Sequence, residues 1–378
     1  MIIFIDENIF EKQAYGGISR YFCELAKAIS QTTEHEIFIY GGWSKNTYLN
    51  QLIQTKNLKV LRLESKWNWL KFAKSWINPM LRKALYLQLR MKGEKIIYHP
   101  SYFSLDPMIH KYCDASVLTV HDLIYEHQEK NKHSKKATKR KKIQNRVDHI
   151  ITVSNSTAHD LKEFNPAIYH KISVVHLAAA PSAIELEQGR NNTFLFVGNR
   201  GGYKNGNLAI QAFANLKAET KQDSQLLFVG GGPFDVDESE TIQALNLEDS
   251  VQQCNLSDQE LSHAYQTSTA LVFPSSYEGF GLPPLEAIQA NCPVIAQKVS
   301  SIPEVLGEWG HYFTNESIDE LCALMKKAAQ PKSTEPSKIR QDLRDQQLRK
   351  FSWSKTANKT LLAYRKSVRK QDHQSINR

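Results

Sequence analysis

The sequence has no long hydrophobic run. A membrane-spanning helix needs about 18 or more consecutive apolar residues, and no uncharged apolar stretch of that length occurs. The N-terminal segment MIIFIDENIF also lacks the basic region and the small-residue cleavage site of a secretory signal. We therefore expect a cytoplasmic protein whose first residues form a buried strand.

Cysteine is scarce, and its spacing argues against two kinds of covalent or metal stabilisation. An odd number of widely spaced cysteines, with no Cys-x-x-Cys, is unlike a disulfide framework or a zinc site. We expect free thiols in a reducing compartment and no metal site. The five cysteines are Cys23, Cys113, Cys254, Cys292 and Cys322.

Two phosphate-binding signatures and all tandem repeats are missing. No Walker A sequence occurs, and Gly230-Gly231-Gly232 does not match the G-x-G-x-x-G fingerprint of dinucleotide-binding folds. No repeat with a period of about 20–50 residues is visible, which argues against solenoids and propellers. The net charge of +9 suggests anionic partners, but it does not choose among nucleic acid, lipid head groups and diphosphates.

What the sequence does contain is a series of short apolar runs that alternate with helical stretches. Runs that are apolar throughout are typical of strands covered on both faces, and their alternation with helices predicts parallel α/β sheets. The runs are residues 2–6, 36–40, 95–99, 116–120 and 149–153, followed by 193–197, 225–229, 270–274 and 293–296.

The series restarts after a polar break at residues 176–192, so we place a domain boundary near 178–192. We predict an N-terminal Rossmann-like domain over 1–178 and a C-terminal one over 179–355, facing each other across a cleft. Residues 356–378 would return to the N-terminal domain as a helix with a frayed tail. Ligands of such sheets bind beyond the carboxyl ends of the strands, where each motif below is found.

Residues 351–366 predict an amphipathic helix with Ser352 as its N-cap. Beyond Lys370 the sequence is polar, and we expect it to fray. The apolar positions of the helix recur at helical spacing and are Trp353, Ala357, Leu361, Tyr364 and Val368.

The most specific motif is SSYEGFGLPPLEAIQANCPVIA at residues 275–296. Glu278 ends a predicted strand, and Pro283-Pro284 suit a first helical turn, where no backbone donor is needed. Such a helix start offers amides and the positive end of its dipole to an anion. With Glu286 inside the helix, two carboxylates beside an amide cradle suit a sugar, a diphosphate and a ribose. Two isolated glutamates would more often cap a turn and favour the helix dipole.

This segment resembles the Glu-x7-Glu motif of glycosyltransferase family 4, a family of retaining enzymes with two Rossmann-like domains, the GT-B fold. The resemblance implies that Glu286 holds the ribose of the donor. It also implies that the C-terminal helix crosses back to the first domain. The donor sugar would be held by Glu278 and by the backbone amides of Gly279, Phe280, Gly281 and Leu282.

A second motif, FLFVGNRGGYKNGNLAI at 194–210, places Arg200 and Lys204 between a strand and a helix. Two cations there could neutralise a diphosphate leaving group, as a metal does elsewhere. A basic glycine-rich loop alone is more often a solvated turn. The resemblance assigns both cations to the donor pyrophosphate. The family more commonly has Arg-Lys-Asn at this place, whereas here Tyr203 precedes Lys204-Asn205. Lys204 is therefore the closer match.

Two segments of the N-terminal half also fit the family. Gly16-Gly17 opens a helix after the first strand, and the resemblance places this loop opposite the donor phosphates. His121 follows the strand at 116–120, and the resemblance places it near the donor sugar and phosphate. We assign His121 an orienting and stabilising role, not that of a nucleophile. Taken alone, a glycine turn and a structural histidine are the simpler interpretations.

Three polar segments lie apart from these motifs. Asp235-Val236-Asp237 spells the metal-binding Asp-x-Asp of another glycosyltransferase architecture, but its acidic setting predicts a solvated loop. Residues 130–146 are densely basic, and residues 66–90 interleave tryptophans with basic residues around Pro79, which we expect to break a helix. Each suits either an ordinary helix surface or peripheral contact with anionic lipid on the inner face of the cell membrane.

Together these expectations describe a metal-independent, retaining hexosyltransferase. It would need no cofactor besides its substrate, a GDP- or UDP-linked sugar such as a mannose donor. The acceptor would be a glycan or a lipid-linked molecule, and family habit suggests bacterial surface polysaccharide: O-antigen, capsule or lipopolysaccharide. The alternatives are a nucleotide-sugar epimerase or a phosphorylase on the same fold. A basic membrane- or nucleic-acid-binding module is more distant because it leaves the motifs unexplained, and we expect no nucleic-acid partner.

Overall fold

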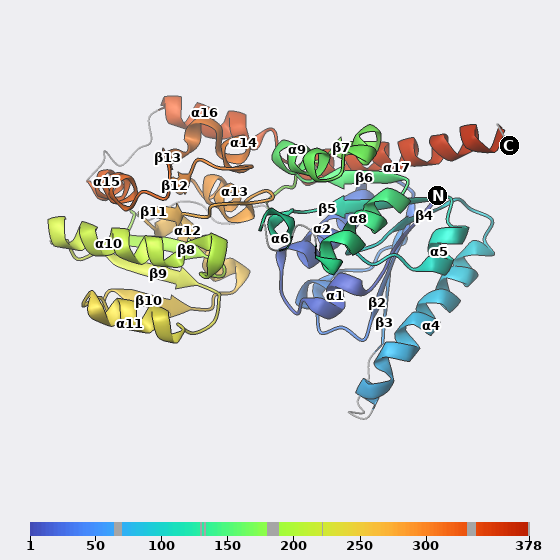
Figure 1. The fold of residues 1–378 in the computed structure, drawn as a ribbon, viewed down its shortest axis with the longest axis horizontal. Coiled ribbons are helices and arrows are strands. Elements are labelled where there is room, and N and C mark those ends of the chain that lie inside the picture. The colour runs from blue at the N-terminus through green and yellow to red at the C-terminus, as the bar shows by residue number, and fades with distance from the viewer. Residues whose placement is uncertain are drawn as a thin grey trace. The chain divides into compact units, whose positions relative to one another are not determined.

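Two parallel sheets organise the chain into two units (Figure 1). The first unit consists of Met1–Leu177 and Trp353–Arg378, and the second unit is Ala178–Ser352. The computed structural model describes residues 1–63, 70–128, 131, 134–179, 189–220, 222–330 and 338–376, without the side chains of 70–75, 338 and 369–376. Parts of three predicted segments therefore lie outside the described residues, namely 66–69, 130 with 132–133, and 180–188.

The first unit has a seven-stranded parallel sheet in the order β3-β2-β1-β4-β5-β6-β7. The strands are β1 (Ile2–Ile5), β2 (Glu36–Gly42), β3 (Leu58–Arg62), β4 (Ile96–His99), β5 (Ala115–Val120), β6 (His149–Thr152) and β7 (Ile172–Val174). The helices are α1 (Asn8–Lys12), α2 (Gly17–Thr32), α3 (Thr47–Gln51), α4 (Leu70–Arg90), α5 (Pro107–Tyr112), α6 (Ile124–His127), α8 (Lys135–Arg146), α9 (Asn155–Phe164) and α17 (Trp353–Ile376), with the 3-10 turn η1 (Pro166–Lys171).

The second unit has a six-stranded parallel sheet in the order β10-β9-β8-β11-β12-β13. The strands are β8 (Thr193–Val197), β9 (Gln225–Val229), β10 (Val251–Cys254), β11 (Ala270–Phe273), β12 (Val294–Gln297) and β13 (His311–Phe313). The helices are α10 (Gly206–Thr220), α11 (Val236–Ala244), α12 (Asp258–Thr267), α13 (Leu282–Gln289), α14 (Ile302–Leu306), α15 (Ile318–Ala329) and α16 (Lys338–Leu348), with the 3-10 turns η2 (Gly202–Lys204) and η3 (Gly307–Trp309).

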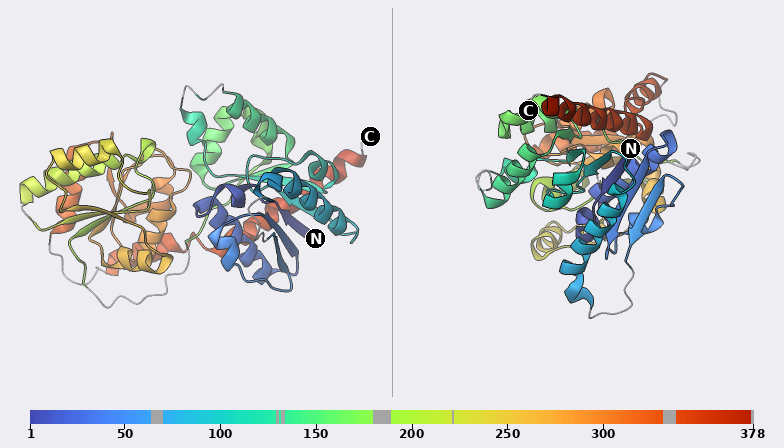
Figure 2. Two further views of the ribbon diagram at one scale, coloured as in Figure 1. Left: turned by 90° about the horizontal axis from the view of Figure 1, so that it is seen from below. Right: turned by 90° about the vertical axis from the view of Figure 1, so that its right-hand side faces the viewer.

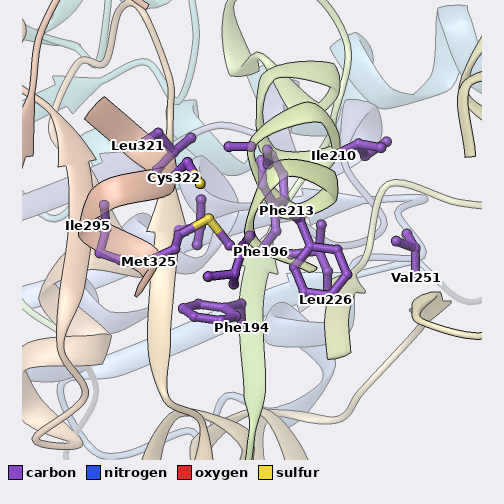
Figure 3. Close-up of a cluster of buried hydrophobic side chains, with 14 of the residues drawn as sticks. Phe194, Phe196, Ile210, Phe213, Leu226, Val251, Ile295, Leu321, Cys322 and Met325 are labelled. Carbon is purple, nitrogen blue, oxygen red and sulfur yellow. The ribbon is translucent and has the colours of Figure 1, made fainter. Parts of the chain in front are cut away.

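Helices cover both faces of each sheet (Figure 2), which explains why the central strands are apolar throughout. On β8, Phe194 and Phe196 face one cluster of buried side chains, and Leu195 faces another on the opposite side of the sheet. Figure 3 shows the first of these clusters, where Phe213 and Met325 pack with the strand residues. The predicted fold class, two α/β units with parallel sheets, is confirmed.

Four strands are absent from the predicted series, and all four lie at sheet edges: β3, β7, β10 and β13. Edge strands have one neighbour and partial exposure, so they need not be apolar on both faces. In β3, Lys59 and Leu61 are exposed, and in β10, Gln252 is exposed. The apolar-run criterion detects strands inside a sheet and overlooks those at its border.

The C-terminal helix α17 belongs to the first unit, where it packs against α2, β5 and β6. The Tyr364 hydroxyl lies 2.7 Å from His99 Nδ1, and the Thr356 hydroxyl donates to the carbonyl of His176 at 2.8 Å. The return of this helix, implied by the resemblance, is thus observed. The helix is described as far as Ile376, and the expected fraying beyond Lys370 stays a prediction. Its last turns contain Arg, Lys and Gln, which favour helical structure.

Two further expectations about local structure are wrong. Pro79 does not break its helix, because α4 runs through it. On either side of the proline, Asn78 binds Glu11 and Arg82 binds Glu7, so both neighbouring turns are held to the first unit. Asp235-Val236-Asp237 is not a loop. Asp235 is the N-cap of α11, and it forms a reciprocal capping box with Glu238. The remaining polar side chains of this segment stay exposed.

Candidate active site

The predicted donor-binding residues of the second unit meet at the place where its strand order reverses. The first strand, β8, lies beside the fourth, β11, so the crossovers from these neighbours diverge. Ligands of doubly wound sheets bind at such a point, beyond the carboxyl ends of the strands. Lys204 follows β8, and Glu278 follows β11.

Lys204 and Glu278 form an ion pair. The Nζ of Lys204 lies 2.6 Å from Oε1 of Glu278, and the side chains are only 15% and 10% exposed. The Lys204 Nζ also lies 5.2 Å from the ring centroid of Phe273 at the end of β11. Each charge thus compensates the other where solvation is poor. The structure brings together the two residues that the sequence ranked highest.

Backbone contacts between the two loops place this pair. The amide of Ser276 donates to the carbonyl of Tyr203 at 2.8 Å, and Nδ2 of Asn205 donates to the carbonyl of Pro274 at 3.1 Å. Asn205 has a left-handed backbone with φ of 53°, which asparagine tolerates better than most residues. The turn before α10 therefore lies against the loop that leads to Glu278.

The loop from Glu278 to Gly281 is held from the next strand connection. The amide of Glu278 donates to Ser300 Oγ at 2.8 Å, and the Ser301 hydroxyl donates to the carbonyls of Glu278 and Phe280. Gly281 has φ of 99°, and an added Cβ would approach Cδ1 of Ile302 to 2.9 Å. Only glycine fits this position without strain.

Helix α13 begins at Leu282, one residue before the predicted start, with Gly281 as its N-cap. Glycine offers no capping side chain, so the positive end of the helix dipole lies beside the Lys204–Glu278 pair. Glu286 lies within α13, where its Oε2 accepts a hydrogen bond from the buried Tyr265 at 3.2 Å. Gly279 and Phe280 belong to the loop that leads into this helix.

Arg200 occupies a different environment from the one the sequence suggested. Its guanidinium is buried and uses all five of its N–H groups within the second unit. Nε and Nη2 donate to the Glu238 carboxylate at 2.8 and 3.0 Å. Nη1 donates to the carbonyls of Gly230 and Gly232, and Nη2 also donates to that of Pro233. Arg200 therefore links the turn after β8 to the turn after β9.

In the first unit, Gly16 and Gly17 form the start of α2, as predicted. The Gln13 side chain folds over this start and accepts a hydrogen bond from the amide of Ser19 at 3.1 Å. The Ser19 hydroxyl donates to the carbonyl of Gly16 at 2.9 Å. One of the amides that this helix start was predicted to offer to an anion, that of Ser19, therefore already binds a protein side chain.

His121 follows β5 and packs edge-to-face on Tyr21, with ring centroids 4.9 Å apart. Its Nε2 is buried and has no hydrogen-bond partner among the described residues. Burial lowers the pKa of His121 to about 3, so the ring is neutral near pH 7. A neutral ring can donate or accept a hydrogen bond, which fits the orienting role assigned to His121 from the sequence.

Ser300, Ser301 and Tyr265 contribute to the site but were not predicted. Ser300-Ser301 follow the apolar run of β12, so the rule that polar residues beyond a strand end line the site would have found them. Tyr265 lies in α12 and carried no such signal. No group of three or more His, Cys, Asp or Glu side chains suited to a metal ion occurs in the described part of the chain.

The buried Arg200 predicts a stability effect that a phosphate-binding cation would not have. Replacing Arg200 with Ala leaves Glu238 buried without its partner, so the free energy of unfolding should fall by about 3 kcal/mol or more. Arg200→Lys should recover little of this, because an ammonium group cannot reproduce the planar fork. Urea unfolding followed by circular dichroism measures both, with the exposed Lys298→Ala as control. Unchanged stability in Arg200→Ala would refute the assignment.

The depressed pKa of His121 predicts a pH effect on stability. Because its folded-state pKa of about 3 lies below the ordinary value of 6.5, the unfolded chain binds the extra proton between these values. The contribution is complete above pH 6.5 and is lost as the pH falls toward 3. His121→Asn should reduce the slope of unfolding free energy against pH, between pH 4 and 6, by up to about 1.4 kcal/mol per unit. Exposed His170→Asn serves as control, and equal slopes in both variants would contradict the assignment.

Two family models match consecutive parts of the chain. Residues 15–180 match glycosyltransferase family 4, and residues 181–346 match the glycosyl transferases group 1. The O-antigen chain mannosyltransferase B of Escherichia coli is 26% identical over 393 residues, which cover 96% of this chain and 99% of that protein. The O-antigen chain mannosyltransferase RfbU of Salmonella typhimurium is 31% identical over 163 residues, covering 43% of this chain and 45% of that protein.

Solved structures share the fold. WaaG, a glycosyltransferase involved in lipopolysaccharide biosynthesis, superposes with a TM-score of 0.63 at 14% identity, covering 97% of this chain and 98% of WaaG. TarM of S. aureus gives a TM-score of 0.72 at 12% identity, covering 96% and 99%. With both halves matched by family models and the donor-side motifs assembled at the strand-order reversal, the chain is a member of the group 1, family 4 glycosyltransferases of the GT-B fold.

Proposed function

We propose that this glycosyltransferase moves a mannose from a nucleotide diphosphate donor to a glycan or lipid-linked acceptor in bacterial surface polysaccharide synthesis. The relatives support this proposal, since the E. coli and Salmonella proteins are O-antigen chain mannosyltransferases. An anionic ligand at the second unit is supported above all by the Lys204–Glu278 pair beside the start of α13.

The ion pair suggests how the donor is handled. In the unliganded site Lys204 is neutralised by Glu278. A diphosphate at the start of α13 would compete for the ammonium group, and Glu278 would then accept hydrogen bonds from sugar hydroxyls. The cation and the helix dipole would stabilise the charge of the departing nucleotide. On this proposal neither a divalent metal nor a cofactor is needed.

The second carboxylate and the histidine would complete the arrangement. Glu286, oriented by Tyr265, would accept hydrogen bonds from the ribose hydroxyls. The neutral His121 would orient the donor sugar through a hydrogen bond rather than by proton transfer. The acceptor would attack on the face from which the diphosphate departs, so the anomeric configuration is retained. Catalysis then rests on positioning and electrostatic stabilisation.

Substitutions at the ion pair test the proposal. Lys204→Ala and Glu278→Ala should each lower the transfer rate by about 100-fold or more, since losing one preorganised charge partner costs about 3 kcal/mol in the barrier. The assay measures nucleoside diphosphate and glycosylated acceptor from GDP-mannose, with a chelator present and absent, and Lys327→Ala, at an exposed lysine of α15, as control. Wild-type rates in both variants, or activity restored only by added divalent metal, would contradict it. An epimerised sugar or a sugar phosphate as product would support the alternative enzymes instead.

We also propose that α4 contacts the cytoplasmic face of the membrane. Four large apolar side chains are exposed at helical spacing along one face of α4: Trp76 (78%), Met80 (69%), Leu87 (51%) and Met91 (81%). Lys83 lies on the same face by this spacing. An apolar stripe with basic residues suits the interface of anionic lipid. Within the described ranges, no helix has the length and apolar character needed to cross a bilayer.

Vesicle sedimentation tests this contact. Trp76→Ser/Met80→Ser should reduce binding to phosphatidylglycerol-containing vesicles several-fold, because each change removes exposed apolar area that would enter the interface. The matched control is Ile53→Ser/Ile339→Ser, which alters two apolar side chains that are 81% and 73% exposed on other elements. Equal binding by the two double variants would exclude α4 as the contact.

A further inference from the structure

A second group of charged side chains lies in the first unit, apart from the donor motifs. Arg140 of α8 is buried and donates to both oxygens of Glu126, each at 3.0 Å. Its Nη2 also donates to the Tyr102 hydroxyl at 3.1 Å, and its guanidinium carbon lies 4.4 Å from the ring centroid of Phe103. The Tyr125 hydroxyl donates to Ser134, the N-cap of α8. These contacts fix two tyrosine rings beside the helix.

Two lysines lie over those rings. The Nζ of Lys12 is 3.9 Å from the ring centroid of Tyr102, and the Nζ of Lys136 is 4.0 Å from that of Tyr125. Lys139 lies in α8 between Lys136 and Arg140. A cation over an aromatic face is attracted by the ring quadrupole. The two tyrosine rings therefore hold the ammonium groups of Lys12 and Lys136 in defined positions.

Among the described residues, the carboxylates nearest this group also have hydrogen-bond partners outside its three lysines. Glu126 binds Arg140. Asp6 accepts hydrogen bonds from Tyr98 and Ser101, and Glu11 binds Asn78. Burial lowers the pKa of Lys12, and Lys139, Arg140 and Lys136 lower it further, against a smaller opposing effect of Asp6. The lysines therefore repel one another where the structure holds them, and an anion would relieve that repulsion.

The group lies at the carboxyl edge of the sheet. Helix α1, with Lys12, follows β1, the segment with Tyr102 and Phe103 follows β4, and α6, with Tyr125, follows β5. Strands β1, β4 and β5 are neighbours in the sheet. This is the edge at which open α/β sheets bind their ligands, and it belongs to the unit that the GT-B fold would use for the acceptor.

We propose that Lys12 and Lys136, held over the rings of Tyr102 and Tyr125, together with Lys139 of α8, bind a phosphate or diphosphate group of the acceptor. This inference rests on the proposed function in one respect, that the first unit binds the acceptor. A phosphoryl group offers several oxygens and more than one negative charge to converging ammonium donors. A single sugar carboxylate would leave most of the positive charge unpaired. The acceptor would thus be a phosphorylated glycan or one joined to its carrier by a diphosphate.

Direct binding of inorganic pyrophosphate tests the site without transfer. The titration uses the full chain carrying Lys204→Ala, so that the donor site does not contribute. Adding Lys12→Ala/Lys136→Ala/Lys139→Ala should weaken pyrophosphate binding about tenfold or more, because three charge-assisted contacts are lost. The matched control, Lys135→Ala/Lys142→Ala/Arg146→Ala, removes the same charge from exposed residues of α8. Equal weakening in both variants, or weakening in neither, overturns the proposal.

Vesicles distinguish a diphosphate-linked acceptor from an ordinary lipid head group. One set contains phosphatidylcholine with polyprenyl diphosphate, and the other contains phosphatidylcholine with phosphatidylglycerol at matched surface charge. The site predicts that the Lys12 triple variant loses binding to the first set relative to the α8 control. A loss confined to phosphatidylglycerol vesicles, with pyrophosphate binding intact, would overturn the site in favour of general contact with the bilayer.

The two proposals fail in different ways. If no nucleotide sugar supports transfer but the Lys12 triple variant still loses pyrophosphate, the proposed function fails and the site stands. If transfer proceeds and pyrophosphate binding is unaffected, the site fails alone. In the active enzyme, the Lys12 triple variant should raise KM for a diphosphate-linked acceptor about tenfold. It should change kcat and the KM for the donor little. Lys→Arg changes at the same three positions should restore binding, because guanidinium groups also pair with phosphates.

Discussion

The Lys204–Glu278 ion pair is the interaction on which the candidate active site of the second unit depends. It joins two loops that leave neighbouring parallel strands and then diverge toward separate helices. A charge held in poorly solvated surroundings is costly without a partner, so each residue requires the other. A backbone hydrogen bond from the Ser276 amide to the Tyr203 carbonyl keeps the two loops in contact independently of that pair.

Two buried arginines join separate segments of the chain around the two groups of charged residues. Arg200 fastens the turn after β8 to three consecutive left-handed glycines after β9, and Arg140 fastens two aromatic segments to α8. In both cases the buried guanidinium binds a glutamate, while the lysines nearby in the chain are available for other contacts. The division suits the chemistry of the two side chains, because the planar fork satisfies many acceptors at once, whereas an ammonium group acts as a mobile point charge.

The central fold followed from the sequence because the inner strands are buried on both faces and must be apolar along their whole length. The edge strands were not predicted, because residues such as Lys59 and Gln252 are exposed there and interrupt the apolar runs. Lys204, Glu278 and the start of α13 were predictable because their chemistry depends on local order: strand, glycine turn, helix. The burial of Arg200 was not, because its acceptors lie 30 and 38 residues later in the chain. One signal was available, since Asp235 and Glu238 have the spacing of a capping box, which predicts a helix start rather than a loop.

The return of α17 makes the first unit discontinuous in sequence, with the second unit inserted between its parts. The buried His99, which also contacts the Thr119 hydroxyl, meets the Tyr364 hydroxyl only after residues beyond 352 have been synthesised. Domains generally fold as units as the chain emerges, and here the second unit is complete before the first. Until the last helix arrives, the surface of α2, β5 and β6 that it covers is open, so a nascent or truncated chain exposes apolar groups that chaperones recognise.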